Sequence, residues 1–175
     1  MSGGLQSAQG IVAVVIAVVA AAVDVRWRRI PNLLTFGAAA AGLIYHAASG
    51  GLHGAGFSAA GWAVGLVLFF PFFALRGMGA GDVKLLAALG AWLGPAATLW
   101  VALFSAIAGG VLAVIVALTR GYLGKAFNNI WWLFGYWRAF GIAASPDLTL
   151  EARNAPRLTY AVPIAVGTLV ALWLR

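Results

Sequence analysis

Two of the four acidic residues stand where the surrounding sequence makes a charge costly. Asp24 follows a long apolar stretch, and Asp82 directly precedes another one. A carboxylate at the centre of a membrane helix costs about 2.5–3.5 kcal/mol. Two carboxylates held together can share one proton, so that the neutral acid binds a carbonyl oxygen while its charged partner activates water. Asp24 and Asp82 are therefore candidate catalytic residues for the hydrolysis of a peptide bond.

Both aspartates also have a purely structural interpretation. Asp24 could end a helix as an interfacial charge paired with Arg26 or Arg28. Asp82 could be the N-cap of a helix that begins at Val83. Capping does not exclude catalysis, so the acid–base pair stays open beside these interpretations.

The residues around Asp82 are unusual for a simple turn. Gly77, Gly79 and Gly81 alternate before it, and such glycines allow the backbone and an extended peptide to approach closely. Lys84 could be a snorkelling anchor at the membrane surface, or a positive charge that influences the pair.

The composition is that of a membrane protein. Of the 175 residues, 63% are hydrophobic and 9% are charged, and the mean hydropathy is +0.98; a soluble domain has about 25% charged residues. Ordinary soluble, disordered and collagen-like chains are therefore excluded. The absence of cysteine excludes disulfides, zinc–cysteine clusters and thiol catalysis. The net charge of +7 indicates membrane topology rather than nucleic-acid binding.

Long apolar runs predict an all-α fold, a polytopic membrane helix bundle with six transmembrane helices. The whole chain, 1–175, then forms one membrane-embedded domain. The spans are expected at about 5–23, 32–48, 57–75, 83–96, 97–118 and 160–174. Pro31 stands where the second helix could begin, and the glycine-rich stretch 50–56 predicts a short loop. A cytoplasmic loop is expected at about 119–158.

The distribution of basic residues predicts that the N-terminus lies outside. Ten of the eleven Lys and Arg residues are then cytoplasmic, as short-loop charge bias requires. These ten are Arg26, Arg28, Arg29, Arg76, Lys84, Arg120, Lys125, Arg138, Arg153 and Arg157. Asp24 and Asp82 share their side, whereas His46 and His53 lie on the opposite one. The sequence therefore predicts neither a metal site nor a cofactor.

An aromatic stretch within the cytoplasmic loop, 122–143, admits three interpretations: an interfacial helix, a re-entrant piece or a seventh span. Asn128, Asn129 and Arg138 interrupt it, and Trp and Tyr concentrate at the membrane–water interface. We therefore expect an interfacial helix on the cytoplasmic face.

Two pairs of glycines have the spacing that lets membrane helices pack closely. They are Gly61 with Gly65, and Gly90 with Gly94. We expect these pairs to pack helices inside the bundle, and dimerisation through them is the alternative.

The residues around the two aspartates resemble the motifs of the type IV prepilin peptidases, which are intramembrane aspartyl proteases of the GxGD class. Asp24 precedes an Ile-Pro-Asn turn, and Asp82 ends a GxGD element that continues as GxGDxKL. The resemblance implies that these two aspartates are catalytic. It implies supporting positions for Pro31, Asn32, Gly79, Gly81, Lys84 and, in the YAVPIAVG segment, Pro163.

The resemblance implies that the protein cleaves a basic leader peptide from a prepilin or pseudopilin precursor, at the cytoplasmic face of the bacterial inner membrane. The short chain looks like the peptidases of tight-adherence (Flp-type) pilus systems, and archaeal preflagellin peptidases are a near alternative. Larger members carry paired CxxC zinc ligands and an N-methyltransferase activity. A chain without cysteine is expected to lack methylation. The partners are then the precursor and the bilayer, without nucleic acid, and the oligomeric state is left open.

Two functions from other classes compete with peptide hydrolysis. A small transporter or channel component could use Asp24 and Asp82 to bind or relay an ion. Against this, no chain of polar groups continues towards the outer side. A structural assembly subunit would tolerate asparagine at both positions.

Overall fold

The computed structural model describes residues 4–5, 7–121, 123–141 and 159–174, and all regular elements in these ranges are helices. The helices are α1 (Ala8–Trp27), α2 (Asn32–Ala74), α3 (Ala80–Thr119), α4 (Leu123–Phe140) and α5 (Ala161–Trp173). By length and composition, α1, α2 and α3 could cross a membrane. The predicted all-α class is therefore confirmed, and the architecture is consistent with a membrane helix bundle.

Helices α2 and α3 each consist of two limbs joined at a glycine. Gly51 has a φ of 56° in α2, and Gly94 has a φ of 76° in α3, immediately before Pro95. A positive φ is accessible to glycine without steric cost, so one residue reverses the chain. The prediction of a loop at 50–56 is wrong, because only Gly51 departs from helical geometry there.

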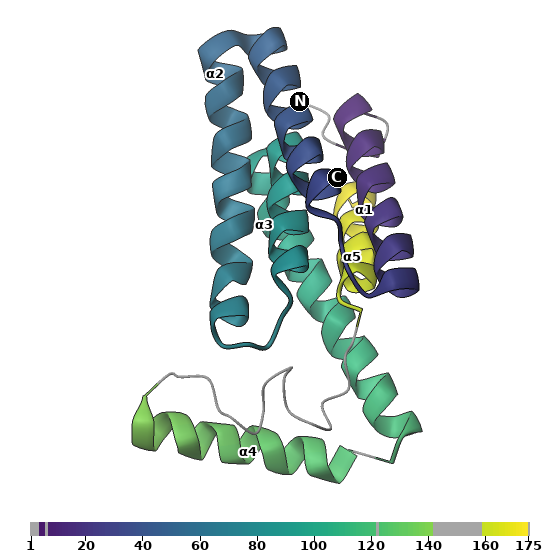
Figure 1. Ribbon diagram of the computed structural model, residues 1–175, viewed down its shortest axis with the longest axis vertical. Coiled ribbons are helices and arrows are strands. Elements are labelled where there is room, and N and C mark those ends of the chain that lie inside the picture. The colour runs from purple at the N-terminus through teal and green to yellow at the C-terminus, as the bar shows by residue number, and fades with distance from the viewer. Residues whose placement is uncertain (1–3, 6, 122, 142–158, 175) are drawn as a thin grey trace.

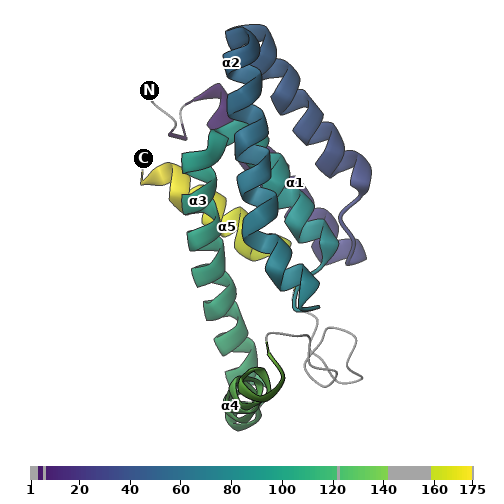
Figure 2. The same cartoon turned by 90° about the vertical axis from the view of Figure 1, so that its left-hand side faces the viewer.

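Helix α3 forms the centre of the bundle. It packs against α2, α5 and α1, and its residues Leu85, Leu86 and Leu89 are buried completely. Ile164 and Leu172 of α5 are buried with them. Figure 1 shows α2 on one flank of the bundle and α1 with α5 on the other. The second limb of α3 continues past the other helices to α4, as Figure 2 shows from the side.

Glycines bring α2 and α3 into backbone contact. A Cβ on Gly61 would overlap the carbonyl oxygen of Gly90, and a Cβ on Gly90 would overlap that of Gly61. A Cβ on Gly65 would lie 2.6 Å from the carbonyl oxygen of Leu86. The expected use of these glycines inside the bundle is therefore observed.

The bend of α3 exposes two backbone carbonyls, and side chains of α2 form hydrogen bonds with them. Pro95 has no N–H, so the Ala91 carbonyl lacks its partner within the helix. Ser58 Oγ donates a hydrogen bond to this carbonyl at 2.8 Å, and His46 Nε2 lies 3.0 Å from the carbonyl of Trp92. Because a carbonyl only accepts, the proton of His46 must be on Nε2. The kink is thus anchored by polar contacts between α2 and α3.

Helix α4 accounts for most of the aromatic stretch 122–143. It lies across the end of the bundle instead of standing beside the other helices (Figures 1 and 2). Trp131 is 81% exposed, and Trp132 stacks on Tyr136 one turn further along, with ring centres 5.5 Å apart. This orientation suits an interfacial helix, although its place relative to a bilayer stays a prediction.

The helix ends agree with the charge pattern found in the sequence. Arg28 follows α1 directly, Arg120 follows α3, and Arg76 lies shortly after α2. Residues 142–158, which include Arg153 and Arg157, lie outside the described part of the chain. Six crossings and an outer N-terminus stay predictions.

Candidate active site

Asp24 lies in the last turn of α1. The helix continues to Trp27, beyond the end of the expected span at 5–23. Its backbone carbonyl accepts the N–H of Arg28 at 2.7 Å, and Arg28 ends the helix with a φ of 52°. The carboxylate faces the backbone N–H of Ala161 and interacts with the charge of Arg28. The residue is only 9% exposed. Asp24 is therefore both near the charge of Arg28 and buried inside the bundle.

Asp82 is the third residue of α3, and Gly79 is the N-cap. The carboxylate of Asp82 interacts with the N–H of Gly79, while its own N–H donates to the Gly79 carbonyl at 3.2 Å. This is the geometry in which the third residue of a helix reaches back to the cap. The interpretation of Asp82 as the N-cap of a helix starting at Val83 is wrong, because α3 begins at Ala80.

The structure brings the two aspartates together from different helices. Asp24 comes from the end of α1 and Asp82 from the start of α3, and their carboxylates are near enough to interact electrostatically. Both residues are buried, and burying two acids in one place is costly unless they share a proton or bind a ligand. Such an arrangement is typical of reactive sites. Within the described ranges, no group of three or more His, Cys, Asp and Glu side chains could hold a metal ion.

The turn between α1 and α2 fits against the first turn of α3. A Cβ on Gly81 would lie 3.2 Å from Cβ of Ile30, so the glycine lets this turn approach closely. Pro31 is the N-cap of α2, as expected for the start of the second helix. The Ile-Pro-Asn turn and the glycine–aspartate element, which are distant in sequence, therefore form one structural unit.

A hydrogen bond joins the same two motifs at the surface. Lys84 Nζ donates to Asn32 Oδ1 at 2.9 Å, and it lies 5.2 Å from the centre of the Phe36 ring. Lys84 therefore ties α3 to the beginning of α2. Neither of the two interpretations of Lys84 in the sequence included this role.

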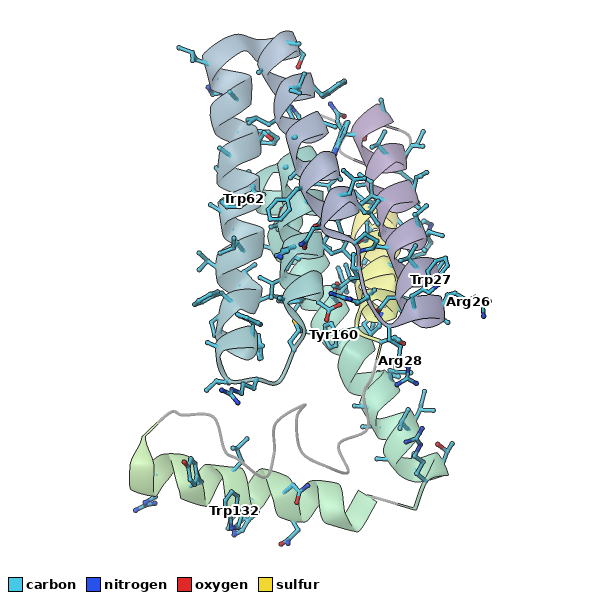
Figure 3. The ribbon with its side chains drawn as sticks, in the orientation of Figure 1. Arg26, Trp27, Arg28, Trp62, Trp132 and Tyr160 are labelled. Carbon is cyan, nitrogen blue, oxygen red and sulfur yellow. The ribbon has the colours of Figure 1, made fainter. Side chains whose placement is uncertain are left out.

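The start of α5 completes the surroundings of the aspartates. The Ala161 N–H faces Asp24, and the Tyr160 hydroxyl interacts with the charge of Asp82. Figure 3 shows Tyr160 beneath the first turn of α5. Pro163 is buried in this turn, where proline is tolerated because its N–H is not needed. The sequence pointed to Pro163 but did not single out Tyr160. It also missed Ala161, since a backbone N–H leaves no mark in a sequence.

The described chain is thus an apolar helical bundle that buries two aspartates, from α1 and α3, within electrostatic reach of each other. A sequence profile of the type IV leader peptidase family matches residues 11–114, which include both aspartates. The chain belongs to this family, and the resemblance found in its motifs is confirmed. Membership indicates a peptidase, and the long apolar helices indicate a membrane protein. Comparisons with curated proteins and with solved structures give no match.

Proposed function

We propose that the protein is an intramembrane aspartyl endopeptidase. It removes the basic leader from type IV prepilin-like precursors of the Flp type, at the cytoplasmic face of the bacterial inner membrane. One observation carries the proposal: Asp24 and Asp82 are both buried, and near enough to interact electrostatically, in a member of the leader peptidase family. The proposed reaction includes no N-methylation, because the chain lacks cysteines that could serve as the zinc ligands of larger members.

The proposed chemistry uses the aspartates as one acid–base pair. The ionised carboxylate takes a proton from water, and the water oxygen attacks the carbonyl carbon of the scissile peptide. The protonated carboxyl donates a hydrogen bond to the carbonyl oxygen as negative charge develops there. The C–N bond then breaks, and the leaving nitrogen takes a proton from the pair.

The proposed topology has six crossings and an outer N-terminus. Helices α1 and α5 and the two limbs each of α2 and α3 supply six apolar segments. Arg28, Arg76 and Arg120 lie at or just beyond helix ends, and basic residues favour the cytoplasmic side. A precursor whose leader precedes a membrane helix would present its cleavage site at that level, near the aspartates.

The test is to co-express the protein with an Flp-type prepilin and to follow processing on a gel. Asp24→Asn and Asp82→Asn keep the size of each side chain but remove the acid. We expect each to lower processing by roughly 10³-fold or more. The matched control is Asp147→Asn, at an acid within the cytoplasmic loop that the sequence predicts at about 119–158; it should process like wild type. Mass spectrometry of the mature pilin should find an unmethylated N-terminus.

Each other outcome has a definite meaning. Full processing by either aspartate variant, at equal membrane levels, would remove that residue from the catalytic pair. No processing of several pilin-like precursors by the wild type would contradict the peptidase proposal and favour an ion pathway.

A further inference from the structure

Tyr160 is held in a fixed position at the start of α5. It is the N-cap residue of this helix, and its ring meets Phe69 of α2 edge to face, with centres 5.9 Å apart. Its hydroxyl lies against Gly109 of α3, where an added Cβ would be 2.7 Å from Oη. Three helices therefore fix the direction of this side chain, and only a glycine at 109 leaves room for it.

The same short segment faces both aspartates. The Ala161 N–H is directed at Asp24, and the neighbouring Tyr160 hydroxyl lies within electrostatic reach of Asp82. Tyr160 therefore borders the space in which the proposed reaction would take place.

Among the described residues, the Tyr160 hydroxyl has no hydrogen-bond partner. It is half-buried, yet it makes no hydrogen bond to any group in the described part of the chain. Buried polar groups normally have a partner, and an unpaired donor beside a carboxyl pair is available to a bound molecule. Tyr45, in contrast, has its hydroxyl within 3.4 Å of Gln9 Nε2.

We propose that the Tyr160 hydroxyl donates a hydrogen bond to the carbonyl oxygen of the scissile peptide. This inference rests on the proposed peptidase function. As water adds to the carbonyl carbon, the oxygen gains negative charge, and a fixed donor stabilises it more strongly than it stabilises the substrate. Tyr160 keeps its proton throughout, and the aspartates carry out the proton transfers. Tyr160 is thus a third catalytic residue.

The experiment compares purified wild type with Tyr160→Phe in a processing assay that yields kcat and KM. Phenylalanine keeps the ring against Phe69 and removes only the hydroxyl. We expect kcat to fall about 10- to 100-fold, because loss of one such donor costs this much or more. KM should change less than about 3-fold, because the bond strengthens mainly in the transition state. The matched control is Tyr45→Phe. Its ring lies against His46 and Trp92 near the bend of α3, so loss of this hydroxyl should leave both constants within about 2-fold.

Gly109→Ala provides a second, independent variant. Its methyl group would displace the Tyr160 hydroxyl without deleting it, so kcat should fall again. Because both changes act on one hydrogen bond, Gly109→Ala should cost less in the Tyr160→Phe background than in the wild type. Thermal unfolding of each variant, measured in the same detergent, checks that the fold is intact.

The inference is overturned if Tyr160→Phe retains kcat within about 2-fold, or if only KM or the melting temperature changes. If Tyr160→Phe is not obtained folded, an unchanged kcat of folded Gly109→Ala overturns it instead. Wild-type cleavage that requires both aspartates but not this hydroxyl would refute this inference alone. Failure of the wild type to cleave would refute the proposed function as well.

Discussion

The kinked end of the bundle and the aspartate end treat their buried polar groups in opposite ways. At the kinked end, Ser58 and His46 of α2 lie against the carbonyls that the bend of α3 exposes. At the aspartate end, each carboxylate meets a backbone N–H, of Ala161 or Gly79, but the Tyr160 hydroxyl has no hydrogen-bond partner among the described residues.

The difference separates stability from reactivity. A buried polar group stabilises a fold when it is fully paired and destabilises it when it is not. Substitutions at the kinked end should therefore lower the free energy of unfolding but leave the rate of processing by the folded protein unchanged. The aspartate end should show the reverse, since its carboxylates and the Tyr160 hydroxyl can still form hydrogen bonds with a substrate and with water.

The largest expected effect on stability comes from Gly90→Ala, which would break the contact between α2 and α3. The new Cβ overlaps the backbone carbonyl of Gly61, which cannot move aside as a side chain could. We expect a loss of about 3 kcal/mol or more in the free energy of unfolding. Gly110→Ala is the control, because nothing lies within 4 Å of a Cβ there. Thermal unfolding followed by tryptophan fluorescence measures both variants, and equal melting temperatures would show that the close approach is unnecessary.

Ser58→Ala should have a smaller effect of the same kind. It leaves the Ala91 carbonyl without its partner, which should cost about 1 kcal/mol. The melting temperature should fall by about 2–4 °C, while processing per folded molecule stays unchanged. A loss of processing without a loss of stability would contradict the separation between the two ends.

The smallest effect is expected at the surface of the aspartate end. Lys84→Ala or Asn32→Ala would break the 2.9 Å hydrogen bond between the two motifs. Each should lower processing about 3-fold, because exposed interactions contribute about 1 kcal/mol or less. The double variant should be no worse than either single one, since the residues act through one bond. Additive losses, measured as initial processing rates, would instead indicate separate roles.

Much of this arrangement could be predicted from sequence. Counting apolar spans placed Asp24 and Asp82 at one depth, and the structure brings them together. Glycine spacing indicated close helix packing, and Gly61 indeed meets Gly90. These predictions succeed because periodic apolar runs and small residues act locally along the chain.

Other features could be identified only from the structure. Gly51 reverses the direction of α2 without a loop, since one residue with a positive φ is enough. Other glycines lie close to it, so the sequence did not show which of them adopts this conformation. The bond between Lys84 and Asn32 spans 52 residues, so neither residue shows it in sequence. Tyr160 was missed because tyrosine at a helix start is common at membrane surfaces.

The shortness of α5 has a consequence for the surrounding lipid. Its 13 residues measure about 20 Å at about 1.5 Å per residue, whereas the hydrocarbon layer of a bilayer is about 30 Å thick. In the proposed topology, in which α5 crosses the membrane, the bilayer beside it would have to thin or admit water at the helix end. A deficit at the Tyr160 end would bring interfacial water to the carboxylates without any channel through the bundle. The acyl-chain length of the surrounding lipid would then determine how easily water, the second reactant of the proposed hydrolysis, reaches the carboxylates.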